Sequence, residues 1–100
     1  MSSAQKEYNG NIARVYVLIR GRVQGVFFRS STRSLAESLD LHGYARNLPG
    51  GDVEAVFEGQ GEAVRKALSW CRRGPARARV DSIETRWEEP AGEAGGFRIL

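Results

Sequence analysis

Residues 21–29, GRVQGVFFR, combine residue types that can bind an anion. Gly21 and Gly25 stand four residues apart, and glycine lets backbone N–H groups turn inward. Arg29 falls in the expected first turn of a helix, so its side chain leans back over the loop. The first N–H groups of a helix lack an internal partner, and the helix dipole adds positive charge there. Because a planar guanidinium matches two phosphoryl oxygens at once, the stretch predicts a site for a phosphoryl group.

The charges around this stretch also favour an anion. No acidic residue occurs between Glu7 and Glu37. The arginines in that span are Arg14, Arg20, Arg22, Arg29 and Arg33. Neither G-x-x-x-x-G-K-[ST] nor G-x-G-x-x-G is present, so the common nucleotide-binding loops are excluded. Taken alone, the glycine pair also fits a tight turn between a strand and a helix, and the local pattern leaves both interpretations open.

Asn47 is a second candidate, near the C-terminal end of an expected strand. Its neutral amide can hold a water molecule through both a donor and an acceptor. Asparagine is also common in turns, here ahead of Pro-Gly-Gly at 49–51, and this alternative stays open as well.

The other residue types that often carry catalysis have simpler interpretations. His42, the single histidine, comes just before Gly43 and is expected to cap the C-terminus of a helix. Cys71 falls on the apolar stripe of a predicted helix and is expected to fill the core. Glu37 and Asp52 have no evident route to the loop and are expected to be solvated charges. No group of residues has the spacing of metal ligands.

The elements that must position these residues follow from the hydrophobic pattern. Residues 14–20 alternate with a two-residue period, which predicts a central strand. From about Phe28 the period becomes helical, and Gly43 is expected to stop this helix. The later elements are predicted as strands at 44–48 and 53–58 with a turn at 49–52, a helix ending in CRRGP at 71–75, a strand at 80–88 and a short strand at 97–100. The apolar phase slips between Val80 and Ile83, where a bulge is expected.

The order strand, helix, strand, strand, helix, strand predicts an α+β fold of the ferredoxin-like kind. A mostly antiparallel sheet then carries both helices on one face, with the short last strand added. We expect the first and second strands to be parallel, with the third between them. Their C-terminal ends then share one edge of the sheet about 10 Å apart, or two strand spacings, which brings Asn47 near the glycine-containing loop.

The composition indicates one folded domain. Of 100 residues, 41% are hydrophobic and 27% charged. Residues 1–12 are expected to form a flexible tail and residues 13–100 the domain. The net charge of +3 favours phosphate or carboxylate partners but is too small to require nucleic acid. A single cysteine, with no signal peptide and no apolar stretch of membrane-spanning length, predicts a cytoplasmic protein.

Two stretches resemble the acylphosphatase family. GRVQGVFFR matches its G-x-V-Q-G-V-x-F-R signature at every fixed position. GYARN at 43–47 is similar to its G-[WY]-[VA]-x-N strand, with Tyr44 where tryptophan is usual and Ala45 where valine is usual. Shorter landmarks follow at EG 58–59, GP 74–75, ARVD 78–81 and F-x-I 97–99, so the likeness covers residues 13–100.

This resemblance implies a ferredoxin-like α/β sandwich that hydrolyses acyl phosphates to a carboxylate and inorganic phosphate. It assigns phosphate binding to Gly21, Arg22, Val23, Gln24, Gly25, Val26 and Phe27. It makes Arg29 the substrate-binding residue and Asn47 the residue that orients water. It implies no metal and no organic cofactor. The expected partners are a small acyl phosphate and inorganic phosphate, the latter as product and competing ligand, with the chain acting as a monomer and binding neither nucleic acid nor membrane.

The absence of an acid or base fits such a substrate. The leaving carboxylate has a conjugate acid with a pKa of about 4 to 5, so it needs no proton at neutral pH. What remains is to position water and to stabilise charge on the phosphoryl oxygens. The proton of the water can pass to a phosphoryl oxygen of the substrate itself.

Two other functions stay in view. One is a non-catalytic phosphate sensor, or a module that handles carbamoyl phosphate for a partner, because similar domains occur at the front of larger maturation proteins. The other is RNA binding, since RRM domains share this sheet plan. It would need exposed aromatic residues such as Tyr16 and Phe57, and the RRM sequence signature is missing.

Overall fold

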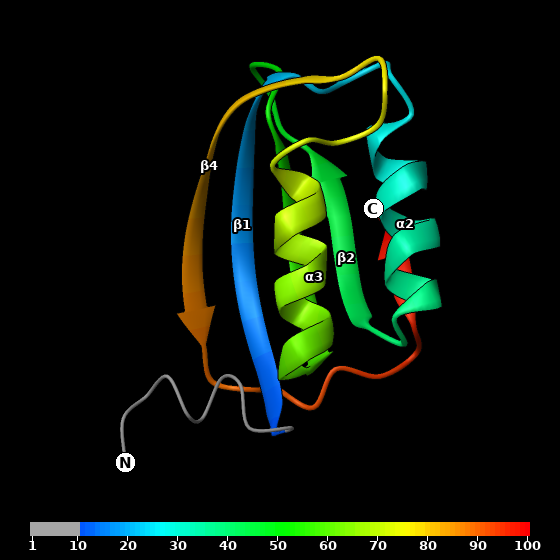
Figure 1. Cartoon of the computed structure of the whole chain (residues 1–100), viewed down its shortest axis with the longest axis vertical. Coiled ribbons are helices and arrows are strands. Elements are labelled where there is room, and N and C mark those ends of the chain that lie inside the picture. Colours follow the sequence, from blue (N-terminus) through cyan, green and yellow to red (C-terminus); the bar gives the residue numbers. More distant parts are fainter. Residues whose placement is uncertain (1–10) are drawn as a thin grey trace.

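A computed structural model describes residues 11–100, in which two helices cover one face of a five-stranded sheet (Figure 1). The elements are β1 (Ile12–Arg22), α2 (Phe28–Ser38), β2 (His42–Asn47), β3 (Val53–Gln60), α3 (Gly61–Cys71), β4 (Arg79–Glu88) and β5 (Phe97–Ile99). The predicted α+β, ferredoxin-like order is therefore confirmed. Of the tail expected at residues 1–12, residues 1–10 lie outside the described residues, and Ile12 already pairs with Gln60 of β3.

The sheet order β4-β1-β3-β2-β5 places the ends of β1 and β2 at one edge. β1 and β2 both run antiparallel to β3, which lies between them, so they are parallel to each other as predicted. Arg22 and Asn47 therefore end their strands at the same edge, at the top of Figure 1. The connection from β1 to α2 and the turn from β2 to β3 both lie there.

The core lies between the sheet and the helices. Val15, Val17 and Ile19 of β1 are fully buried, which explains the alternation seen in the sequence. Phe57 of β3 is also fully buried, and its ring stacks on Phe97 at 5.4 Å between centroids. Phe57 is thus not exposed on the sheet, so the RNA-binding alternative loses one of its two aromatic residues.

The predicted bulge in the strand at 80–88 is confirmed. Arg20 pairs with Ser82 and Gly21 pairs with Val80, which leaves Asp81 as the extra residue. Gly21 has φ 138°, and a Cβ there would lie 2.1 Å from the carbonyl oxygen of Arg79. Only glycine permits this close approach of the two strands, so the first glycine of the loop is needed for strand pairing.

The expected end of the first helix is wrong, and so is the role of His42. The helix α2 ends at Ser38, because Asp40 takes φ 57° and the N–H of Leu41 donates to the carbonyl of Ala36 at 2.8 Å. This is a Schellman-type ending in which aspartate stands where glycine is usual. His42 begins β2 instead, and its Nδ1 accepts the N–H of Gly96 at 3.0 Å.

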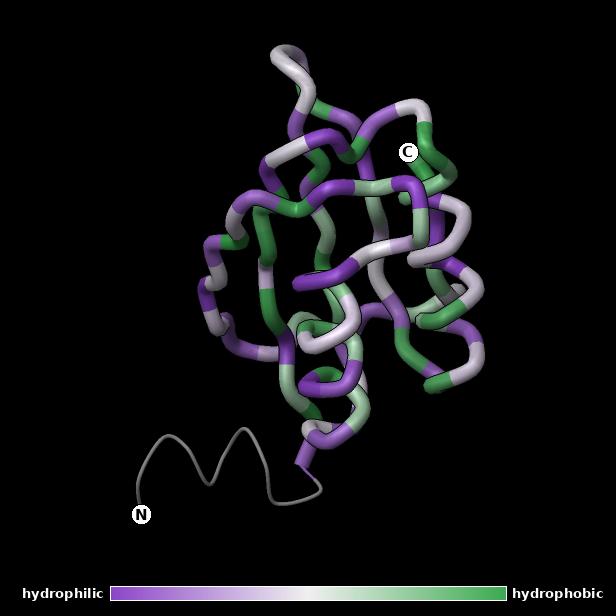
Figure 2. The backbone as a smooth tube through the Cα atoms, turned by 45° about the horizontal axis from the view of Figure 1, so that its top comes forward, coloured by the Kyte–Doolittle hydropathy of each residue, from purple (hydrophilic) through white to green (hydrophobic). Residues whose placement is uncertain are grey.

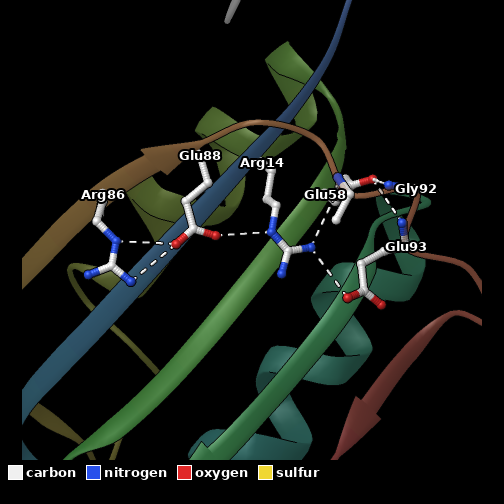
Figure 3. Close-up of polar contacts among 7 residues, drawn as sticks. Arg14, Glu58, Arg86, Glu88, Gly92 and Glu93 are labelled. Carbon is white, nitrogen blue, oxygen red and sulfur yellow. Dashed lines mark hydrogen bonds and ion pairs between the residues drawn. The ribbon is translucent and has the colours of Figure 1, made fainter.

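The sheet face opposite the helices carries paired charges (Figure 3). The guanidinium of Arg14 contacts the carboxylates of Glu58, Glu88 and Glu93 at 3.0 to 3.3 Å. The Glu58 carboxylate also accepts three consecutive backbone N–H groups, at residues 91–93, each at 2.9 Å. This network fastens the connection between β4 and β5 to the end of the sheet away from the loop at 21–27.

Candidate active site

The predicted phosphate-binding loop leaves β1 and leads directly into α2. Val23 anchors it in the core with 1% of its surface exposed, while Gly25 is exposed and has φ 73° with open space around it. Phe27 precedes the helix with φ 63° and ψ 25° and makes no side-chain cap. Within residues 11–100, no acceptor is found for the backbone N–H groups of residues 24–27. The loop therefore offers several backbone donors at a helix N-terminus, which is the arrangement that suits an anion.

Gln24 fastens this loop to the turn between β2 and β3. Its Nε2 donates to the carbonyl oxygens of Leu48 and Asp52, both at 2.8 Å. The turn closes on itself through the Leu48 N–H and the Asp52 carbonyl, also at 2.8 Å, which confirms the turn predicted at 49–52. A side chain that the resemblance assigns to phosphate binding thus has a structural task in the described chain.

Asn47 immediately precedes Leu48, whose carbonyl accepts the hydrogen bond from Gln24. It is half-buried at the end of β2, and its Oδ1 is buried without a hydrogen-bond partner among the described residues. A buried acceptor normally has a partner, so this unpartnered oxygen marks an unmet hydrogen bond next to the loop. The expected closeness of Asn47 to the loop agrees with the position of Leu48.

An open pocket of about 260 Å³ lies where the loop meets α2. Its lining residues are Gly25, Phe27, Arg29, Ser30 and Ile99. Three of these were predicted from the sequence, and the other two were not. Ser30 is exposed, and its hydroxyl donates to the carbonyl of Phe27 at 3.2 Å. Ile99 comes from β5, and no local signal in the sequence could place it here. Asn47 is not among the lining residues.

An arginine without a carboxylate partner among the described residues lies at the start of α2. In the part of the chain that the structure describes, Arg29 is half-buried and makes no ion pair, and the first turn of α2 contains no acidic residue. The connection between α3 and β4 packs against the start of α2, because a Cβ on Gly74 would lie 2.5 Å from the ring of Phe28. Figures 1 and 2 both show this connection beside the loop at 21–27.

The other candidate residues are paired with a cation, exposed to solvent or buried in the core. Asp52 forms an ion pair with Arg20 at 3.6 Å, and Glu37 is exposed on α2. Cys71 is fully buried, as predicted, and burial raises the pKa of its thiol to about 12, so it stays protonated at neutral pH. Among residues 11–100, no three His, Cys, Asp or Glu side chains are grouped so that they could hold a metal ion. No helix in the same residues is long and apolar enough to cross a membrane.

Comparison with known proteins places the chain in a family. The acylphosphatase family model matches residues 15–99. An acylphosphatase of Roseiflexus sp. (strain RS-1) is 52% identical over 90 residues, which are 90% of this chain and 97% of that protein. The structure of an acylphosphatase from Coxiella burnetii has a TM-score of 0.85 at 34% identity, over 93% of this chain and 97% of that one. A segment of full-length HypF, solved in a phosphate- and nucleotide-bound form, has a TM-score of 0.82 at 25% identity, over 90% of this chain and 12% of HypF. The chain belongs to the acylphosphatase family.

Proposed function

We propose that the chain hydrolyses acyl phosphates to a carboxylate and inorganic phosphate in the pocket between the loop at 21–27 and α2. One observation supports the proposal most strongly. Backbone N–H groups without a partner in the described chain stand next to an arginine without a carboxylate partner, at one helix N-terminus. Family membership supports the same reaction.

In this proposal, Arg29 and the loop hold the phosphoryl group. The guanidinium pairs with two phosphoryl oxygens, and the backbone N–H groups donate to them as negative charge builds up in the transition state. The half-buried position of Arg29 supports this role, because a guanidinium that is partly shielded from water interacts more strongly with an anion.

Asn47 orients the attacking water through its Oδ1. The water oxygen forms a bond to phosphorus, and the bond between phosphorus and the acyl oxygen breaks with its electron pair on the carboxylate. The proton of the water passes to a phosphoryl oxygen, so the products are a carboxylate and a protonated phosphate. The unpartnered Oδ1 supports this role, as does the position of Asn47 beside Leu48, whose carbonyl accepts a hydrogen bond from Gln24 of the loop.

Hydrolysis of benzoyl phosphate tests the proposal directly. The purified chain should remove the ultraviolet absorbance of benzoyl phosphate, and inorganic phosphate should compete with the substrate. A decay rate equal to that of buffer alone would contradict the proposal. Action as a monomer and a cytoplasmic location remain predictions, to be tested by sedimentation and by cell fractionation.

The likeness to a segment of HypF, solved in a phosphate- and nucleotide-bound form, favours one second candidate, the non-catalytic phosphate-binding module. Such a module would bind inorganic phosphate and leave benzoyl phosphate intact. Calorimetric titration with phosphate, run beside the hydrolysis assay, separates the two functions.

A further inference from the structure

The pocket has an apolar wall that phosphoryl chemistry does not explain. Phe27 is 74% exposed and Leu100 is 54% exposed, and with Ile12 they are the exposed large hydrophobic residues among residues 11–100. Phe27 lines the pocket together with Ile99, the neighbour of Leu100. Phosphoryl oxygens are held by hydrogen-bond donors and positive charge, so an apolar wall beside them must meet another part of a ligand.

The backbone fixes both residues of this wall. Phe27 is held in a left-handed conformation, where its carbonyl accepts the N–H of Ser31 at 3.0 Å. Such a conformation is unfavourable for phenylalanine by roughly 1 to 2 kcal/mol, and glycine or asparagine would adopt it more easily. Ile99 is held by the pairing of β5 with β2, opposite Ala45. A large ring kept exposed at a position that disfavours it indicates a task for the ring.

We propose, on the basis of the function proposed above, that Phe27 and Ile99 form a subsite for the acyl group of the substrate. Gly25 and Arg29 lie in the same pocket and take the phosphoryl end. The acyl group is bonded to that phosphoryl group, so it must extend along the remaining lining. The enzyme therefore prefers acyl phosphates with longer aliphatic or aromatic acyl groups over the smallest ones.

Acetyl, butyryl and hexanoyl phosphate test this preference. Straight-chain carboxylic acids differ little in acidity, so the leaving group is matched while the apolar area changes. For the wild type, kcat/KM should rise about two- to fourfold with each added CH2, the upper value corresponding to full burial of that group. The rise should appear mainly as a lower KM, because the contact is present before the chemical step.

Two variants test whether Phe27 and Ile99 cause the preference for longer acyl groups. Phe27→Asn keeps a residue that tolerates the left-handed backbone and removes the ring, and Ile99→Ser removes the second apolar side chain. Each should flatten the ratio of hexanoyl to acetyl phosphate, measured within the same variant so that shared losses cancel. Phe27→Tyr should restore the ratio. Ile12→Ser, an exposed hydrophobic residue at the far end of β1, is the control and should change nothing.

The outcomes separate this subsite from the reaction itself. If all three substrates are hydrolysed with equal kcat/KM, or the variants keep the wild-type ratio of hexanoyl to acetyl phosphate, the subsite proposal is wrong. The proposed function then still stands. If none is hydrolysed, the proposed function fails. The subsite is then tested by calorimetry alone, where hexylphosphonate should bind more tightly than methylphosphonate in the wild type and not in Phe27→Asn. Equal binding of the two would overturn it.

Discussion

Arg29 is the residue on which phosphoryl binding depends most. Lysine in its place keeps the positive charge but loses the planar pair of donors. We expect Arg29→Lys to lower kcat/KM for benzoyl phosphate roughly 100-fold or more, the usual cost of removing one transition-state donor. Arg33→Lys, one turn later on α2 and exposed, is the matched control and should stay near the wild type. Equal losses in both variants would mean that Arg29 acts only through the helix.

Asn47 should affect turnover more than phosphate binding. Asn47→Ala removes the buried Oδ1 and leaves the loop and Arg29 in place. We expect kcat to fall by a factor on the order of 100, because misplaced water is costly, while the inhibition constant of inorganic phosphate changes little. Steady-state kinetics with phosphate as the competitor measures both quantities. Wild-type turnover in this variant would remove Asn47 from the mechanism.

At the scale of single residues, the sequence predicted those site residues that lie close together in the chain. The glycines and Arg29 fall within nine residues, so the loop and the start of the helix could be read from their spacing. Ile99 could not, because it reaches the pocket only through the pairing of β5 with β2. The capping role predicted for His42 is wrong because Asp40, rather than a glycine, takes the left-handed position that ends α2.

Among the elements, the connection between β4 and β5 depends on one carboxylate (Figure 3). Glu58 accepts the N–H groups of residues 91–93 and the guanidinium of Arg14. Glu58→Gln removes the charge and turns an amide NH2 toward these part-buried donors, so it should lower the free energy of unfolding by about 1 to 3 kcal/mol. Urea unfolding near neutral pH measures this loss. Glu89→Gln, at an exposed position just after β4, is the control and should have little effect.

The same carboxylates make the stability fall in acid. Burial raises the pKa of Glu58, but the N–H donors and Arg14 outweigh it, so the net pKa lies below the ordinary value of 4.5. Burial likewise raises the pKa of Glu88, but the hydrogen bonds from Arg14 and Arg86 outweigh it and leave the net pKa lowered. A carboxylate whose pKa is lower in the folded state stabilises the fold at pH values above its unfolded pKa. This stabilisation is lost as the pH falls through the folded pKa. Unfolding midpoints should therefore drop as pH falls below about 4.5. Glu58→Gln should flatten this drop, and an unchanged pH profile in that variant would contradict the assignment.

For the whole molecule, the position of the third strand between the first and the second followed from the sequence, because the pattern of strands and helices allows few arrangements. The two strands that carry the site are parallel and separated by β3, as the pattern requires. The bulge was visible too, since Val80 and Ile83 are out of phase and Asp81 is the extra residue. The charge network around Arg14 was not visible, because it joins side chains 44 to 79 positions apart.

The distribution of charge along the molecule predicts a salt effect. The network of Arg14, Glu58, Glu88 and Glu93 lies at the end of the sheet away from the site. At the site end, the connection between α3 and β4 carries exposed arginines that pair with no carboxylate among the described residues, namely Arg72, Arg73 and Arg77. Exposed charges attract an anion at low salt and are screened beyond about 10 Å at 0.1 M.

This charge distribution should accelerate the capture of an anionic substrate. We expect kcat/KM for acetyl phosphate to fall roughly three- to tenfold between about 20 mM and about 500 mM salt, with kcat nearly constant. Replacing Arg72, Arg73 and Arg77 together by glutamine should weaken the dependence, because the charges that attract substrate before binding are gone. Lys66→Gln on α3 shows how much any lost positive charge contributes. A triple variant with the full wild-type salt slope would place the attraction at Arg29 and the loop alone.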